Sequence, residues 1–162
     1  MRIRPAEASE TAVLARLWDD GWQDAHAAIL PAALARARTL ESFAERIEAS
    51  LDDVRTTGPI GAPLGFTMLK GDELNQLYVS AKAYGTRVAA ALIADAEARL
   101  LHRGVATAWL HCAIGNLRAA RFYEKSGWRR AGTVACRLDT AQGPFDIDIW
   151  RYEKRLASID RG

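Results

Sequence analysis

Residues 116–128 carry the strongest structural signal in the chain and read Asn-Leu-Arg-Ala-Ala-Arg-Phe-Tyr-Glu-Lys-Ser-Gly-Trp. An Asn at the start of a helix can cap that helix or bind an amide of a ligand. Ala119 is small enough to let a neighbouring group approach, and Tyr123 lies about two helical turns beyond the Asn. The stretch predicts a short helix over residues 117–125 that presents Asn116 and Tyr123 on one surface.

The residues that precede this stretch predict a helix and then a strand. Apolar residues recur at every fourth position from Val88 to Leu100, and Gly104 supplies the left-handed conformation that commonly ends a helix. Residues 105–113 are rich in β-branched and aromatic residues and are apolar on both faces. We therefore expect a helix followed by a central strand that is buried on both faces.

Two further helical regions are predicted in the N-terminal third of the chain. Residues 9–25 place leucines and tryptophans at helical spacing. The second region runs from Pro31 to about Leu51, where a Pro suits the first helical position, and a break is expected near Thr39.

The remaining segments predict strands. Residues 58–65 form the densest cluster of turn-forming residues and separate two extended runs. Strands are expected over residues 66–69 and 74–79, and a closing hairpin is expected over residues 128–149. The order is a strand, two helices, three strands, a helix, a strand, a helix and two strands.

Length and composition agree with one globular unit. The chain has 162 residues, of which 49% are hydrophobic and 26% are charged, as in ordinary globular proteins. With no internal repeat and no linker, the element order predicts a single α/β domain over residues 1–162 with a mixed sheet.

Charge and cysteine content exclude several classes of protein. The net charge of +2 comes from 22 basic and 20 acidic residues without a long run of one sign, so no nucleic-acid partner is expected. Cys112 and Cys136 are far apart and not in metal-ligand spacing, so neither a disulfide framework nor a metal site is predicted. The chain lacks a signal peptide pattern and a run of about 18 apolar residues, so we expect no membrane partner and a cytoplasmic location.

Residues 116–128 resemble the motif Asn-x-x-Ala-x-x-Phe-Tyr-Glu-Lys-x-Gly-aromatic of the GNAT superfamily at every defined position. The resemblance implies an acetyl-CoA-dependent N-acetyltransferase with a mixed, mostly antiparallel sheet flanked by four helices. In that family the Tyr at the position of Tyr123 donates a proton to the departing CoA thiolate, which suits a phenol with a pKa of about 10. From helical spacing alone, Tyr123 would be interpreted as a core aromatic beside Phe122.

Residues 77–93 resemble a second GNAT element, a strand followed by a tight turn and the start of a helix. Family members carry Gln/Arg-x-x-Gly-x-Gly/Ala here, and N–H groups at the helix N-terminus bind the CoA pyrophosphate. The physics supports such an anion site, because these N–H groups lack partners and the helix dipole favours negative charge.

This sequence departs from that pattern at two of three defining positions. Tyr84 replaces the usual Gln or Arg, Arg87 replaces the usual Gly, and Ala89 conforms. Arg87 could add a positive charge next to the pyrophosphate or could crowd it. The cofactor-binding residues implied by the two resemblances are Leu77, Val79, Tyr84, Gly85, Thr86, Arg87, Val88, Ala89, Asn116, Ala119 and Tyr123.

The strand before the turn adds a candidate base. Glu73, Asn75, Leu77 and Val79 alternate and are expected on one face. Family enzymes often carry a Glu near this place as general base, so Glu73 resembles that residue, and the alternative is a solvated carboxylate at the end of a strand. The resemblance also assigns the Val79 N–H as the donor that polarises the thioester carbonyl.

Trp22 and His26 are the predicted acceptor-binding residues. They lie one helical turn apart in a region that resembles the first helix of a GNAT subset, in which the first two helices flank the acceptor pocket. A lone His is more often structural, and this alternative stays open.

The function predicted from these resemblances is transfer of an acetyl group from acetyl-CoA to a primary amine of a small molecule, peptide or protein by direct attack. The alternative is a catalytically impaired CoA-binding or interaction module, because the pyrophosphate turn is altered. Dimerisation is common in the family, so a homodimer is a further expectation. Trp150 and Tyr152 could serve its interface or simply cover the sheet.

Overall fold

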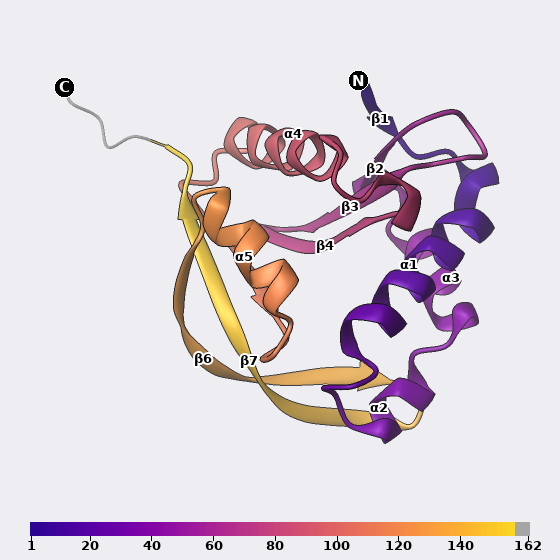
Figure 1. Ribbon diagram of the computed structural model, residues 1–162, viewed down its shortest axis with the longest axis vertical. Coiled ribbons are helices and arrows are strands. Elements are labelled where there is room, and N and C mark those ends of the chain that lie inside the picture. Colours follow the sequence, from indigo (N-terminus) through magenta and orange to yellow (C-terminus); the bar gives the residue numbers. More distant parts are fainter. Residues whose placement is uncertain (158–162) are drawn as a thin grey trace.

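The structure, a computed structural model, describes residues 1–157 and contains a seven-stranded sheet flanked by helices (Figure 1). The strand order is β1-β2-β3-β4-β5-β7-β6, and all neighbouring pairs are antiparallel except β4 and β5. The strands are β1 (Ile3–Pro5), β2 (Val54–Thr57), β3 (Gly65–Lys70), β4 (Glu73–Val79), β5 (Thr107–Cys112), β6 (Arg129–Thr140) and β7 (Gly143–Arg155). The helices are α1 (Thr11–His26), α2 (Ala32–Ala37), α3 (Leu40–Ala49), α4 (Val88–His102) and α5 (Leu117–Lys125). The elements follow the predicted order and confirm a mixed, mostly antiparallel α/β fold.

The second helical region divides at Thr39, where the sequence suggested a break. The Thr39 hydroxyl accepts a hydrogen bond from the Ser42 N–H at 3.1 Å, and the Ser42 hydroxyl oxygen accepts one from the Thr39 N–H at 2.9 Å. This reciprocal cap starts α3 as a new helix. Residues 1–157 therefore contain five α-helices, one more than predicted, and none of them is long and apolar enough to cross a bilayer.

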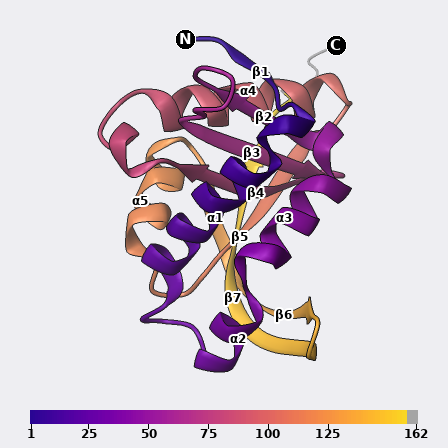
Figure 2. The same cartoon turned by 90° about the vertical axis from the view of Figure 1, so that its right-hand side faces the viewer.

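The two faces of the sheet are covered by different helices. α1 and α3 lie side by side over β2–β4 in Figure 2, and Trp18 stacks on Phe43 with ring centroids 4.7 Å apart. α4 and α5 cover the other face, where Leu100 and Tyr123 belong to the core that also includes β5 and β7. The helices thus hold the sheet between two separate apolar layers.

β5 lies at the centre of the sheet as predicted, but only one of its faces is fully buried. Ala108, Leu110 and Cys112 are buried, whereas Trp109 and His111 are only half-buried. The Arg151 guanidinium stacks 4.5 Å from the centroid of the Trp109 ring. The expectation of burial on both faces is wrong, because a charged side chain of β7 covers Trp109 instead of an apolar layer.

A bulge in β4 changes which side chains share a face. Met68 of β3 pairs with Gln76 and Leu69 pairs with Leu74, so Asn75 is an extra residue in β4. After the bulge, Leu77 packs toward α4, whereas Glu73 lies on the side of α1 and α3. The predicted alternation of Glu73 with Leu77 and Val79 on one face is therefore wrong, because one inserted residue reverses the phase.

β4 and β5 diverge soon after they meet. The only register pair between them within residues 1–157 is Glu73 with Trp109. Two bonds to Asp72 support this junction, one from the Trp109 N–H to the Asp72 carbonyl at 3.3 Å and one from the Trp109 indole at 2.8 Å. Beyond this point the two strands separate and leave a gap in the sheet.

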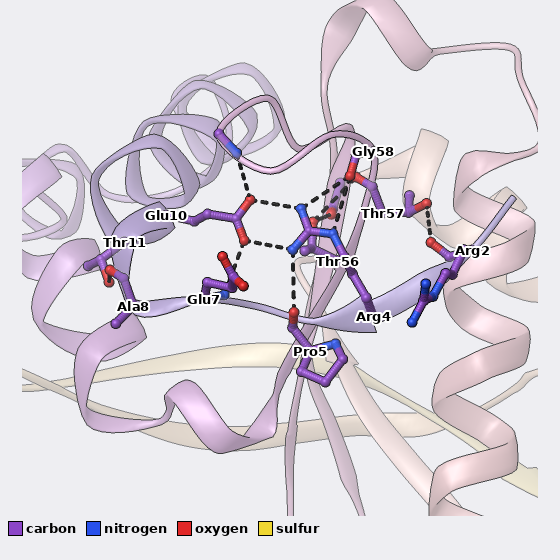
Figure 3. A network of polar contacts seen from close by, with 12 residues as sticks. Arg2, Arg4, Pro5, Glu7, Ala8, Glu10, Thr11, Thr56, Thr57 and Gly58 are labelled. Atoms are coloured by element: carbon purple, nitrogen blue, oxygen red, sulfur yellow. Dashed lines mark hydrogen bonds and ion pairs between the residues drawn. The ribbon is translucent and has the colours of Figure 1, made fainter.

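An ion pair fixes the N-terminus of the chain to the start of α1 (Figure 3). The side chain of Glu10 is fully buried and accepts two hydrogen bonds from the Arg4 guanidinium, each at 2.8 Å. It also accepts bonds from the N–H groups of Glu7 and Gly61, both at 3.1 Å. The Arg4 hydrogen bonds, opposed by burial, hold the pKa of Glu10 at about 2. The carboxylate therefore stays ionised and joins β1, α1 and the β2–β3 loop.

The β6–β7 hairpin extends past the sheet toward α2, as Figure 1 shows. The Arg38 side chain, just after α2, donates a hydrogen bond to the Asp139 carbonyl at 3.2 Å. Leu138 and Phe145 of the hairpin pack against the core that contains α1 and α3. The hairpin consequently closes one side of a space next to α1. It is remote in sequence from the other segments that surround this space.

The aromatic residues of β7 cover the sheet. Tyr152 is fully buried, and its hydroxyl donates a 2.6 Å hydrogen bond to Glu124. Trp150 is half-buried, with the Arg130 guanidinium 3.9 Å from its ring centroid. Both side chains therefore have partners within one chain.

Candidate active site

A cleft of about 770 Å³ opens where β4 and β5 diverge. Its walls are the end of β4, the turn that leads into α4, the start of α5 and the face of α1 around Gly21. We call it the large cleft. It lies at the carboxyl ends of the only two parallel strands in the described part of the sheet, where open α/β sheets commonly bind ligands.

Backbone N–H groups of β4 point into the gap in the sheet. The Ser80 N–H donates to the Leu64 carbonyl at 2.8 Å, which directs it toward the β3 side. Successive N–H groups of a strand point to opposite edges, so the Val79 and Leu77 N–H groups face the β5 side. Both residues line the large cleft, as the predicted cofactor site requires.

The turn between β4 and α4 forms a second wall. The Thr86 hydroxyl donates to the Ala83 carbonyl at 2.5 Å and accepts from the Val88 N–H at 3.3 Å, which caps α4. Gly85 has a φ of +75°, a left-handed conformation that glycine adopts without strain. Gly85, Thr86 and Ala89 all line the large cleft at the positive end of the α4 dipole.

The two unusual residues of this turn have different positions. Tyr84 lines the large cleft, and the Arg118 guanidinium lies 4.3 Å from its ring centroid. Arg118 also pairs with Asp24 of α1 at 3.8 Å, so a cation lies at the edge of the cleft. Arg87 is exposed, and neither it nor the buried Val88 is among the residues that line the cleft. The structure thus gives no sign that the Arg87 side chain crowds this space.

Asn116 and Tyr123 both line the large cleft from α5. The Asn116 side chain accepts a 3.3 Å hydrogen bond from the Ala119 N–H, so it caps the helix as predicted. Tyr123 is 9% exposed, and burial raises the pKa of its hydroxyl above the ordinary value. The phenol is therefore protonated at neutral pH and can donate a proton.

Two smaller cavities lie next to the large cleft and share lining residues with it. A narrow passage of about 70 Å³ shares Asn116, Ala119 and Tyr123 with it. A further cavity of about 170 Å³ shares His26 and Tyr78 with the passage. We call it the hairpin cavity, because the β6–β7 hairpin forms one wall, opposite residues of α1, α2, α3, β4 and β5.

Glu73, Trp22 and His26, which the sequence assigned to catalysis and acceptor binding, all line the hairpin cavity. Burial raises the pKa of Glu73, and the nearby Asn75, Lys70 and Arg46 offset part of this rise. Burial lowers the pKa of His26 to about 4, so its ring is neutral at physiological pH. The His26 Nδ1 lies 3.1 Å from the Trp22 carbonyl, which can only accept a hydrogen bond, so Nδ1 carries the proton and Nε2 is an acceptor.

Several residues of the site were not identified from the sequence. Tyr78 lines the large cleft, the passage and the hairpin cavity. Arg38 and Arg46 line the hairpin cavity. Gly21 lies against Tyr78, and a Cβ at this position would be 2.6 Å from the Tyr78 ring. A glycine in the middle of a predicted helix is the one sequence signal that could have indicated this close approach.

Comparison with known proteins places these features in a family. A sequence model described as the acetyltransferase (GNAT) family matches residues 15–128. One uncharacterized N-acetyltransferase of Mycobacterium bovis and two of Mycobacterium tuberculosis are each 36% identical over 101 residues, which is 59% of this chain. The match spans 65% of the length of these relatives.

Solved structures show the same fold. A GCN5-related N-acetyltransferase from Rhodopseudomonas palustris is similar with a TM-score of 0.75 and 22% identity, over 95% of this chain and 94% of that one. A putative acetyltransferase from Salmonella typhimurium, solved with its cofactor acetyl-CoA, has a TM-score of 0.70 and 15% identity, over 100% of this chain and 97% of that one.

Proposed function

The chain belongs to the GNAT acetyltransferase family, and from this premise we propose that it transfers an acetyl group from acetyl-CoA to a primary amine by direct attack. One observation carries the proposal. Val79 at the end of β4, the residues at the start of α4 and Tyr123 of α5 all line the one cleft that opens between β4 and β5, which supports this reaction.

The residues of the large cleft fit acetyl-CoA in charge and in polarity. The start of α4, with Gly85, Thr86 and Ala89, offers the positive end of a helix dipole to a pyrophosphate. The outward N–H groups of Leu77 and Val79 offer donors to an amide-containing chain along β4. Acetyl-CoA supplies an activated acetyl thioester when bound.

In the proposed reaction, three groups of the chain each stabilise a change of charge. The Val79 N–H donates to the carbonyl oxygen as negative charge develops there. The Tyr123 phenol gives its proton to the sulfur as the thiolate leaves. Glu73 accepts a proton from the acceptor amine, directly or through water.

A base is useful because an amine with a pKa near that of Lys is only about 0.1% neutral at pH 7. Deprotonating the amine therefore costs about 4 kcal/mol of free energy at pH 7. A carboxylate that accepts the proton reduces this cost. Glu73 lines the hairpin cavity, and its pKa lies above the ordinary range because of burial, so it is a stronger base than an exposed Glu.

The test has two readouts. Titration calorimetry measures acetyl-CoA binding, and release of free thiol measures transfer across a panel of primary amines. We expect binding in the micromolar to submillimolar range and amine-dependent thiol release. Binding without release on any amine would favour the alternative of an impaired CoA-binding module, and no binding at millimolar acetyl-CoA would overturn both.

A further inference from the structure

The hairpin cavity contains more hydrogen-bond donors and positive charge than an amine acceptor needs. Arg38 and Arg46 both line it, and the Arg46 guanidinium lies 4.5 Å from the Trp18 ring centroid. The Arg38 side chain bonds only a neutral carbonyl, that of Asp139. Among residues 1–157, no carboxylate lies within 4.0 Å of either guanidinium. Two arginines therefore share a small cavity without an ion-pair partner.

Burial makes this arrangement unfavourable without an anion. Burial and the charge of Arg38 lower the pKa of Arg46 to about 10, and burial also lowers the pKa of Arg38. Both side chains are half-buried and lose part of their hydration, and Glu73 and Asp139 act on them only from beyond ion-pair distance. Such a pair is typical of a site that a negatively charged ligand completes.

Two neutral groups add to the set of donors. The Trp18 side chain is fully buried and lines the cavity, and its indole N–H lies beside the Tyr78 hydroxyl, which can accept from it. Tyr78 lines the same cavity, and its hydroxyl keeps one proton that it can donate to a ligand.

The only carboxylate among the residues that line the cavity is Glu73. Arg38, Arg46 and Glu73 together give the lining one net positive charge when Glu73 is ionised, because burial favours the neutral forms of His26 and His111. An acceptor with one ammonium and one carboxylate group matches this pattern, with the ammonium toward the carboxylate and the anion toward the arginines. A polycationic amine does not match it.

We propose that the acceptor is a small amino carboxylic acid with an apolar side chain, whose carboxylate binds Arg38 and Arg46. This inference rests on the proposed acetyl transfer and names its acceptor class. The size supports it, because a cavity of about 170 Å³ is smaller than the roughly 300–1,000 Å³ of pockets for drug-sized ligands. Most of the cavity lining is polar, and Leu34, Leu138 and Ile149 supply an apolar part on which an aliphatic or aromatic side chain can pack.

The test compares each amino acid with its amide. Leucine, methionine and phenylalanine, together with leucinamide, methioninamide and phenylalaninamide, are assayed with acetyl-CoA by free thiol release. We expect at least one amino acid to exceed its amide by about tenfold or more in kcat/KM. Arg46→Gln and Arg38→Gln should reduce this ratio to near 1, because they slow the amino acid much more than its amide.

Arg36→Gln is the matched control, because Arg36 is exposed on α2 and does not line the cavity. The ratio should keep its wild-type value in this variant. The inference would be overturned if the amides react as fast as the amino acids. It would also be overturned if Arg38→Gln and Arg46→Gln leave the ratio of amino acid to amide kcat/KM unchanged. Neither result would contradict the proposed acetyltransferase activity.

A second measurement does not depend on turnover. Calorimetry with CoA-saturated protein measures the affinity for the same three amino acids, and we expect it to fall about tenfold or more in Arg46→Gln. If the protein binds acetyl-CoA but neither binds nor acetylates any of the three, the acceptor class is wrong. Failure of the proposed function itself would be seen separately, as a lack of acetyl-CoA binding.

Discussion

The large cleft and the hairpin cavity meet at Tyr78 but are built from different parts of the chain. N–H groups of β4 and the start of α4 dominate the large cleft, so much of its chemistry comes from backbone geometry. The hairpin cavity instead collects side chains from α1, α3, β4 and the β6–β7 hairpin, together with Arg38. Side chains can change without altering the fold, whereas backbone groups are tied to it.

This difference explains why the large cleft is informative about the family, whereas the hairpin cavity is informative about the acceptor. A ligand common to a family can be bound through backbone groups that every member shares. Under the proposed function, an acceptor that differs between members would need contacts from side chains, and the hairpin cavity offers two arginines, one carboxylate and several apolar residues. Substitutions on the two sides should therefore change different kinetic parameters.

Tyr123→Phe should have the largest effect and tests the large cleft. Removal of the proton donor should lower kcat by about 10²–10⁴-fold, the usual contribution of a positioned acid. The acetyl-CoA affinity should change less than twofold, because the ring stays in place. Stopped-flow or steady-state thiol release gives kcat, and calorimetry gives the affinity.

Tyr152→Phe is the control for this substitution. Its ring lies 6.1 Å from that of Tyr123 in the same core, but its hydroxyl bonds Glu124 and lines none of the three cavities. Turnover in this variant should stay within about twofold of wild type. Equal losses in the two variants would mean that Tyr123 acts through packing rather than through its proton.

Glu73→Gln tests the acceptor side through the pH profile. A base must be deprotonated to act, so kcat/KM should rise with pH as Glu73 loses its proton, at a pH above the ordinary Glu value of 4.5. The variant should lose this acidic limb and about 10²-fold in kcat/KM, while the acetyl-CoA affinity stays unchanged. The measurement is kcat/KM between pH 5 and 9 for both proteins.

If the pH profile of Glu73→Gln keeps its acidic limb, a group other than Glu73 acts as the base. His26 is one candidate, because it lines both the passage and the hairpin cavity, as His111 also does, and its Nε2 can accept a proton. The double variant with His26→Gln would then remove the limb. Loss of acetyl-CoA affinity in Glu73→Gln would instead contradict the separation of the two regions.

Gly21→Ala should have the smallest effect and tests the wall that the two regions share. The added Cβ would lie 2.6 Å from the Tyr78 ring, so the ring must shift. Overpacking of about 1–3 kcal/mol should outweigh the helix-propensity gain of about 1 kcal/mol, and unfolding free energy should fall by about 1 kcal/mol. Because Tyr78 lines both the large cleft and the hairpin cavity, KM for acetyl-CoA and KM for the amine acceptor should each rise a few-fold.

Gly132→Ala provides the comparison for Gly21→Ala. A Cβ at Gly132 would have no heavy atom within 4 Å, and the residue has no left-handed φ. Both KM values should match those of the wild type. A change in only one KM in Gly21→Ala would show that Tyr78 matters to one region alone.

Much of the fold could be predicted because it depends on local patterns. The four-residue apolar period of α4 and the motif of α5 each identify an element without knowledge of its neighbours. The same motif located Asn116 and Tyr123, which the structure places in one cleft. The break at Thr39 was also visible, because a cap is a local feature.

The rest of the site could not be predicted because it depends on long-range geometry. The extra residue Asn75 reverses the phase of β4, and only the pairing with β3 reveals it. Arg38 and Arg46 belong to the site because the β6–β7 hairpin lies opposite them, about a hundred residues further along the chain. Periodicity carries no information about such a meeting of distant segments.

The gap between β4 and β5 also has a thermodynamic consequence. The two parts of the sheet share a single register pair within residues 1–157, so direct bonds between these strands contribute little to holding them together. A ligand that binds only the folded chain adds RT ln(1 + [L]/Kd) to its stability, about 2.7 kcal/mol at a hundred times Kd. Proteolysis often follows the population of opened states, so under the proposed function the supply of acetyl-CoA would govern the lifetime of the protein as well as its rate.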